Sequence, residues 1–214
     1  MSQIIETPAH IAAALEALRM LDPALIPVIE AAGAAVPLRR REPGFEGLAR
    51  IVVSQQLSVA SAAAIWRRFE AAFPCDDQMR ILKAGDADLR SCGLSAPKIR
   101  TLRALASAVV EEGLDLEAIG ALPAEAVSGR LTAIVGIGPW TADIFMMFCL
   151  GHADAFAPGD LALQEAARIA FRMRKRPDAG KLAIRARKWR PHRAVAARLL
   201  WEYYRVVKTR EGIG

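Results

Sequence analysis

Hydrophobic residues recur along most of this chain at intervals of three and four, the spacing that gathers them on one face of a helix. The clearest stripe covers residues 48–73 and consists of Leu48, Val52, Val59, Ala62, Trp66, Phe69 and Phe73. Gln55 interrupts it, so we expect a break at residues 55–58, with Ser58 capping a second helix. No run of residues alternates between polar and apolar positions in the manner of a strand. The pattern therefore predicts an all-α protein.

Further helices are expected from the same periodicity and from the prolines that bound it. They cover residues 10–20, 23–32, 87–91, 97–112, 123–134, 161–171, 178–189 and 192–207. Pro177 and Pro191 separate the last three of these helices. Residues 36–44 hold prolines and three adjacent arginines, so we expect them to form a linker.

The charge of the chain is unevenly distributed. Of its 214 residues, 53% are hydrophobic and 24% are charged, as in globular proteins, and the formal net charge is +6. Residues 168–214 hold 15 lysines and arginines against 3 acidic residues, whereas residues 1–167 hold 14 against 20. A basic C-terminal quarter indicates a face that binds a polyanion, although a solvated surface explains the same composition equally well.

Residues 134–142 read Ile-Val-Gly-Ile-Gly-Pro-Trp-Thr-Ala and lie between two apolar helical segments. Gly136 and Gly138 permit a tight turn and leave backbone N–H groups uncovered, while Pro139 suits the first turn of the next helix. The uncovered N–H groups of such a helix start form a phosphate site, to which the Thr141 hydroxyl can add. An ordinary loop between two helices is the alternative, and a bare Gly-x-Gly favours it.

Asp160 follows Pro158 and Gly159 and precedes an apolar helical segment. A helix N-cap after a Pro-Gly turn is a sufficient explanation for an aspartate at this position. The functional alternative is a carboxylate held at a loop-to-helix junction and facing a cleft. The two interpretations are compatible, because a capping geometry also fixes the side chain.

The hairpin GIGxxTA, followed by a loop that ends in Pro-Gly-Asp, resembles the helix-hairpin-helix DNA glycosylases. Three further segments resemble the 3-methyladenine branch of that superfamily: Ser-Gln-Gln-Leu-Ser at 54–58, Gly-Leu-Ser-Ala-Pro-Lys at 93–98 and Trp-Arg-Pro-His-Arg at 189–193. They occur in the family's order and span residues 45–205.

The resemblance implies two helical lobes with a cleft between them. Residues 1–45 would pack with residues 152–214, which hold the catalytic loop and the basic helices, and residues 46–151 would form the core lobe with the hairpin. Some bacterial relatives carry an additional N-terminal β-rich domain, and this chain resembles the compact form without it.

The resemblance also implies the chemistry. An alkylated purine of the 3-methyladenine or 7-methylguanine class is already cationic and leaves readily, so the one carboxylate of Asp160 can suffice to stabilise the sugar cation or orient water. Relatives that cleave the strand through a Schiff base place a lysine at the position of Trp140, so lyase activity is not expected. No cysteine follows Cys149, so no iron–sulfur cluster is expected either.

Roles for other residues follow from the resemblance alone. Gln56 would fill the space left by the flipped base and Leu57 would wedge the opposite strand. The indoles of Trp140 and Trp201 would line a pocket for the cationic base. The residues expected to contact DNA phosphates are Gly136, Gly138, Thr141, Arg190 and Arg193. A structural monovalent cation is expected at the backbone carbonyls of Thr132, Ile134 and Ile137. Core packing for Leu57 and the tryptophans, and solvated charge for the arginines, are the alternatives.

Double-stranded DNA with alkylated bases is thus the expected partner of a monomer, and neither a membrane contact nor another cofactor is expected. The N-terminus lacks a basic segment leading into an apolar stretch, so we expect no signal peptide and a cytoplasmic location. Three alternatives stay open. They are a non-catalytic helix-hairpin-helix DNA-binding protein, a glycosylase for hypoxanthine, ethenoadenine or uracil, and an all-α protein-interaction module.

Overall fold

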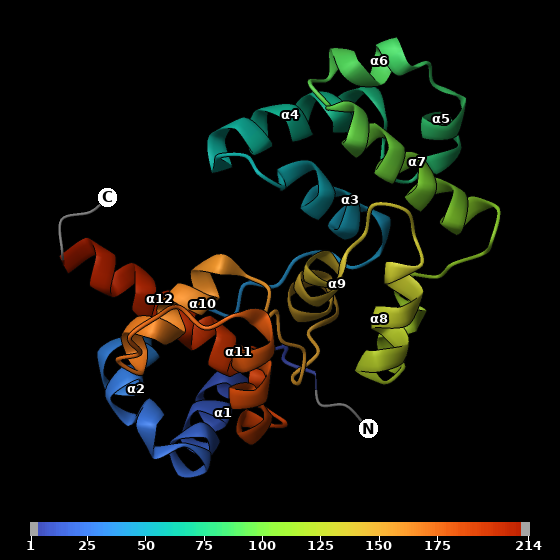
Figure 1. Ribbon diagram of the computed structural model, residues 1–214. Coiled ribbons are helices and arrows are strands. Elements are labelled where there is room, and N and C mark those ends of the chain that lie inside the picture. Colours follow the sequence, from blue (N-terminus) through green and yellow to red (C-terminus); the bar gives the residue numbers. More distant parts are fainter. Residues whose placement is uncertain (1–3, 211–214) are drawn as a thin grey trace. The chain divides into compact units, whose positions relative to one another are not determined.

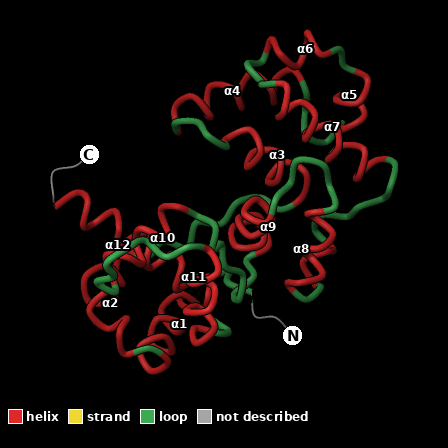
Figure 2. The backbone as a smooth tube through the Cα atoms, in the orientation of Figure 1, coloured by secondary structure: helices red, strands yellow, loops and turns green. Residues whose placement is uncertain are grey.

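The structure, a computed structural model, describes residues 4–210 of the chain (Figures 1 and 2). Helices and short helical turns account for most of this range, and its extended pairing is limited to one isolated bridge between Ile4 and His152. The all-α prediction is confirmed. Within the described range, no helix is long and apolar enough to span a bilayer.

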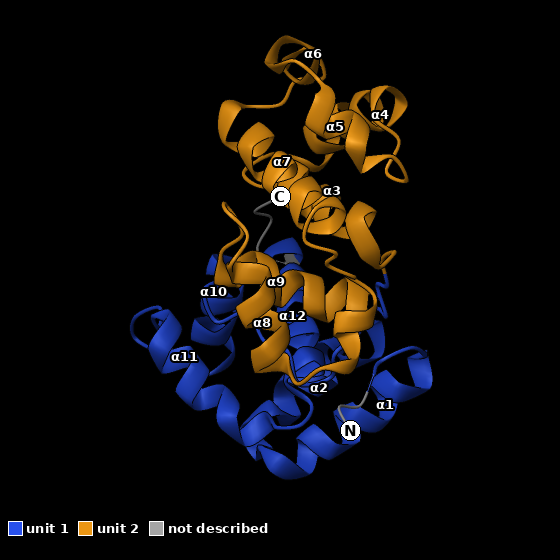
Figure 3. Ribbon diagram, turned by 90° about the vertical axis from the view of Figure 1, so that its right-hand side faces the viewer, with its two compact units in different colours: residues 1–40, 151–214 blue, residues 41–150 orange. Residues whose placement is uncertain are grey.

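The chain divides into two compact units (Figure 3). Residues 1–40 and 151–214 make the first unit, so both ends of the chain contribute to it. Residues 41–150 make the second unit.

Helix α12 (Arg193–Arg210) organises the first unit. It contacts α1 (Pro8–Leu21), α2 (Ile26–Ala32) and α10 (Leu161–Ala170), which surround it in Figure 1. Its residues 194–200 are all buried, so this segment forms the centre of the core. The unit is completed by α11 (Ala179–Ala186) and by short 3-10 turns at Pro23–Leu25, Gly33–Ala35 and Arg187–Trp189.

Helix α3 (Gly44–Ser54) is the central helix of the second unit, as α12 is of the first. It contacts α4 (Val59–Ala72), α7 (Ala96–Val110) and α9 (Pro139–Phe145), and it lies beside α7 in Figure 1. The remaining elements are α5 (Gln78–Lys83), α6 (Asp86–Ser91), a 3-10 turn (Ala118–Ala121), α8 (Ala124–Thr132) and a π-helical turn (Met146–Leu150) that continues α9.

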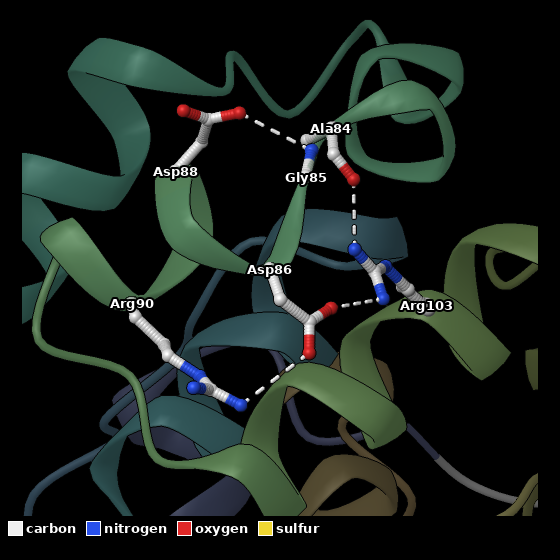
Figure 4. Close-up of polar contacts among 6 residues, drawn as sticks. All are labelled: Ala84, Gly85, Asp86, Asp88, Arg90 and Arg103. Atoms are coloured by element: carbon white, nitrogen blue, oxygen red, sulfur yellow. Dashed lines mark hydrogen bonds and ion pairs between the residues drawn. The ribbon is translucent and has the colours of Figure 1, made fainter.

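A set of polar contacts fixes the corner that leads from α5 through α6 to α7 (Figure 4). The Arg103 guanidinium on α7 donates to the Asp86 carboxylate and, at 2.7 Å, to the carbonyl of Ala84. Asp86 also pairs with Arg90 at 3.5 Å, and Asp88 accepts the N–H of Gly85 at 3.2 Å. These contacts are largely solvated, so each is weak, but together they hold one side of α7 in place.

The helix predictions hold wherever the signal is local. Ser58 caps α4 as expected, because its hydroxyl accepts the N–H of Ser61 at 3.2 Å. The prediction for 178–189 is right in extent but not in type, since the α-helix ends at Ala186 and a 3-10 turn follows. Helix α5 and the π-helical turn were not predicted, because six residues and one widened turn leave no distinct periodicity.

Candidate active site

Asp160 lies in the first unit, where a loop turns into α10. Its Oδ1 atom accepts the N–H of Leu163 at 2.8 Å, which is the N-cap hydrogen bond of the helix. The loop is tied on both sides of it: the Asp160 N–H donates to the carbonyl of Ala157 at 3.1 Å, and the buried Gln164 amide donates to that of Pro158 at 2.9 Å. The capping interpretation is confirmed, whereas the catalytic role stays a prediction.

Trp201 contributes a second donor to the same carboxylate oxygen. It lies on α12, which packs against α10, and its indole N–H donates to Asp160 Oδ1 at 3.1 Å. Both side chains are half-buried. Two N–H donors from different helices therefore fix the rotamer of the Asp160 side chain while part of it remains exposed. Such a fixed and accessible carboxylate suits charge stabilisation at a reacting atom.

The contact between Trp201 and Asp160 was not predicted from the sequence. Trp201 was expected to line a base pocket with the face of its ring, and the contact between its N–H and Asp160 spans 41 positions of the chain. Gln164 was missed as well, although its place one helical turn after an N-cap aspartate is a local signal that it supports the preceding loop.

The two predicted DNA-contacting arginines are both engaged by Asp154 in the first unit. The Arg193 guanidinium donates to the two carboxylate oxygens of Asp154 at 2.7 and 3.0 Å, and its side chain is only 17% exposed. Arg190 lies 3.4 Å from the same carboxylate and is more exposed. Arg190 thus has a solvent-facing part, whereas the pairing of Arg193 with Asp154 ties the start of α12 to the preceding loop, and the phosphate contacts of both arginines stay predictions.

The predicted hairpin lies in the second unit, between the end of α8 and the start of α9. Gly136 has a φ angle of +88°, and a Cβ atom there would meet the Thr101 hydroxyl oxygen at 1.9 Å, so no other residue fits. Gly138 is the N-cap residue of α9, and the space beside it is open. The Ile137 N–H donates to the carbonyl of Ile134 at 3.0 Å, which closes the turn.

The Thr141 hydroxyl faces the second unit's interior. Thr141 is buried, and its Oγ1 atom accepts the side-chain amide of Gln55 at 2.8 Å. The hydroxyl therefore joins the hairpin to the segment at residues 55–58. Phosphate contacts by Gly136, Gly138 and Thr141, like the cation at the carbonyls of Thr132, Ile134 and Ile137, stay predictions. Backbone carbonyls are suitable ligands for such a hard cation.

Residues 55–58, between α3 and α4, form the second predicted DNA-contacting segment, here called the wedge loop. Gln56 is exposed and has a left-handed φ of +56°. Leu57 is 38% exposed and Val59, the first residue of α4, is 89% exposed. Core packing, the alternative interpretation of Leu57, is therefore wrong, and the loop and the first residue of α4 each expose one apolar side chain.

Lys98 supports the wedge loop from the first turn of α7. Its ammonium group donates to the carbonyl of Val53 at 2.7 Å and to that of Gln55 at 2.9 Å. Burial lowers the pKa of the Lys98 amino group from its ordinary value. In the sequence, Lys98 belongs only to a turn segment that resembles the family, and no function was predicted for it.

Trp140 is half-buried at the second position of α9, and Ile144, one helical turn later, is buried. The candidate residues are thus grouped by unit. The first unit brings together Asp160 and Trp201, with Arg190 and Arg193 paired to Asp154. The second unit contains the hairpin, the wedge loop and Trp140.

The chain is similar to a known protein family, to curated relatives and to solved structures. The model of the HhH-GPD superfamily of base excision DNA repair proteins matches residues 49–192. DNA-3-methyladenine glycosylase 1 of Schizosaccharomyces pombe is 33% identical over 174 residues, which are 77% of this chain and 74% of the relative.

Two solved structures are similar over most of the chain. The 3-methyladenine DNA glycosylase of Schizosaccharomyces pombe in complex with abasic DNA aligns with a TM-score of 0.79 and 30% identity, over 88% of this chain and 95% of that one. The DNA-3-methyladenine glycosidase of Bacillus halodurans aligns with a TM-score of 0.77 and 31% identity, over 95% and 92% of the two chains.

Proposed function

This chain belongs to the HhH-GPD superfamily of base excision DNA repair proteins, and we propose that it is a DNA glycosylase that removes alkylated purines from duplex DNA. The substrate class is that named in its relatives, which are 3-methyladenine glycosylases at 30% identity and above. The observation that carries the proposal is the Asp160 carboxylate, which two N–H donors hold at the start of α10.

The chemistry needs only one carboxylate when the base is already cationic. The bond between C1′ of the sugar and the ring nitrogen breaks, and its electron pair leaves with the base and neutralises the positive charge. The Asp160 carboxylate stabilises the cation that develops at C1′. The oxygen of a water molecule then bonds to C1′, and its proton passes to Asp160 or to solvent.

The other candidate residues have roles in exposing the base. Leu57 wedges into the base stack and Gln56 fills the vacated space, which offsets part of the few kcal/mol that unstacking costs. The rings of Trp140 and Trp201 hold the flipped cationic base. The hairpin and Arg190 contact phosphates, which fixes the protein on the duplex without reading its sequence.

Trp140 stands where strand-cleaving relatives carry a lysine, so no amine is available for a Schiff base at that position. Simple base release with an intact abasic strand is the proposed product. A monomer bound to one lesion is the proposed active form, and the location is that of the genome, which in a bacterium is the cytoplasm.

The test is the release of bases from methylated duplex DNA, followed by chromatography of the freed purines. Wild-type protein is expected to release 3-methyladenine or 7-methylguanine. Asp160→Asn is expected to reduce the rate by about 10²–10³-fold or more, the effect of removing one charge-stabilising group from an active site. Equal rates for the two proteins would exclude the catalytic role of Asp160.

Asp178→Asn is the matched control for this test. Asp178 is the N-cap residue of α11 in the same unit and accepts the N–H of Lys181 at 2.8 Å, so the substitution changes the same chemistry at a second helix start. It should release bases at the wild-type rate. If the wild type binds DNA in a salt-sensitive manner yet releases no base from methylated, hypoxanthine, ethenoadenine or uracil DNA, the chain is a non-catalytic DNA-binding protein.

A further inference from the structure

The ammonium group of Lys98 lies at the C-terminal end of α3, where helix carbonyls lack partners within the helix. It contacts the carbonyls of Val53, in the last turn, and Gln55, the C-cap residue, at 2.7 and 2.9 Å. A cation at this end also meets the negative end of the helix dipole. These two contacts are enough to stabilise α3, but they also reach the first residue of the wedge loop.

The wedge loop has an unusual conformation that needs support. Gln56 adopts a left-handed φ of +56°, which is unfavourable for residues other than glycine and persists only where the surroundings impose it. Lys98 holds the carbonyl immediately before Gln56, and the Ser58 cap holds the chain immediately after Leu57. The Gln55 side chain is anchored separately on Thr141 of α9.

Three anchors therefore hold the wedge loop, in which the side chains of Gln56, Leu57 and Ser58 are exposed. Leu57 in the loop is 38% exposed, and Val59, the next residue but one and the first of α4, is 89% exposed. A loop whose backbone is fixed in this way, with exposed apolar side chains, is suited to insert into a base stack without changing its conformation.

We propose that Lys98 is a positioning residue of the glycosylase, which holds the wedge loop so that Leu57 and Val59 enter the base stack at the correct depth. The inference rests on the proposed function and adds a residue to it. A misplacement of about 1 Å in such a group is enough to cost on the order of 10²-fold in rate. Lys98 therefore affects base removal through the loop and without touching the substrate.

The first measurement is the single-turnover rate of base release with enzyme in excess over methylated duplex. Lys98→Met removes both hydrogen bonds and keeps most of the side-chain volume. We expect its rate at saturating enzyme to fall at least about tenfold, because the wedge is displaced. Affinity for undamaged duplex should change little, because the phosphate contacts are elsewhere. Lys83→Met, the same substitution at an exposed lysine on α5 of the same unit, should match the wild type.

A fluorescence signal separates positioning from general stability. With 2-aminopurine next to an abasic-site analogue, unstacking by the wild type should increase the emission, and Lys98→Met should give less of this increase at equal occupancy. The double variant with Leu57→Ala should lose hardly more rate than Leu57→Ala alone, since both substitutions disable one wedge. Fully additive losses, or an unchanged unstacking signal, would overturn the proposal.

Thermal unfolding decides which variant is used. If Lys98→Met is not folded at the assay temperature, Lys98→Gln takes its place, because the amide still donates to one of the two carbonyls. The double variant Lys98→Gln with Leu57→Ala should likewise lose hardly more rate than Leu57→Ala alone. Fully additive losses of rate would contradict the proposed role of Lys98. The wild type separates the two levels of inference: no base release from any substrate refutes the proposed function, whereas release unaffected by either Lys98 substitution refutes only the role of Lys98.

Discussion

Two aspartate–tryptophan pairs in the first unit make hydrogen bonds of the same kind. Asp22 caps a 3-10 turn by accepting the N–H of Ala24 at 3.3 Å, and it accepts the indole N–H of Trp189 at 2.9 Å. Asp160 caps α10 and accepts the indole N–H of Trp201 at 3.1 Å. In each pair a helix start supplies one donor and a C-terminal tryptophan supplies the other.

Burial and charge separate the two pairs. Asp22 is 3% exposed and Trp189 is fully buried, and Lys188 lies 2.7 Å from the Asp22 carboxylate, with Arg185 at 3.9 Å. Burial raises the pKa of Asp22, but the hydrogen bonds from Lys188 and Trp189 and the nearby positive charges outweigh it, so the pKa is lowered overall. Asp160 and Trp201 are both half-buried. The same contacts thus stabilise the fold where the carboxylate is buried, and where it is accessible they hold it in the position that the proposed chemistry needs.

The largest effect that tests this contrast is on stability. Asp22→Ala leaves the buried Trp189 N–H without its acceptor, which costs about 1–3 kcal/mol of the free energy of unfolding. The Lys188 ammonium also loses its partner, but its side chain is 44% exposed and water offsets most of that loss. Denaturant unfolding measures this loss. The rate of base release per folded molecule should equal that of the wild type, since Asp22 has no part in the proposed reaction. A specific loss of rate at full folding would show that the two pairs are not functionally distinct.

The pH dependence of stability should follow Asp22 as well. Because its pKa is lowered in the folded state, ionised Asp22 stabilises the protein above the ordinary value of 3.8, and this contribution is lost as the pH falls through the lower folded pKa. The difference in unfolding free energy between the wild type and Asp22→Asn should therefore be constant near neutral pH and shrink below pH of about 4. A difference that grew on acidification would contradict the assignment.

The next effect belongs to the accessible pair. Trp201→Phe keeps a ring on α12 and removes the N–H that fixes Asp160, and one hydrogen bond to a charged group corresponds to at least about tenfold in rate. Single-turnover release of 7-methylguanine measures it, with binding to an abasic duplex as the control for affinity. Trp189→Phe is the mirror variant: it should reduce stability and leave the rate per folded molecule unchanged. The idea fails if the two phenylalanine variants have the same phenotype.

Local signals in the sequence predicted much of this molecule. The Ser58 and Asp160 caps and the break after Ser54 depend on neighbours within a few residues, and the structure confirms them. Packing over tens of residues decides the rest. Asp160 meets Trp201 41 residues away, and Lys98 meets Val53 45 residues away, so periodicity carries no trace of either contact.

The family resemblance has a similar limit. It named Trp201 as a base-pocket residue and Arg193 as a phosphate contact, and both roles stay predictions, because a motif reports which side chains are present but not what else they contact. The structure places the Trp201 N–H on Asp160 and the Arg193 guanidinium on Asp154. A side chain with several donors takes the partner that packing brings within reach, and this partner is known only once the helices are placed.

The smallest expected effect separates the capping function of Asp160 from its proposed catalytic one. Asparagine caps helices about as well as aspartate, so Asp160→Asn should change the free energy of unfolding by no more than about 0.5 kcal/mol. Asp160→Ala removes the cap and should cost about 1 kcal/mol. Thermal or denaturant unfolding of the two variants measures the difference. If the aspartate serves only the helix, base release should follow stability, and Asp160→Asn should be nearly as active as the wild type. If it serves the reaction, both variants are inactive although only the alanine variant is destabilised.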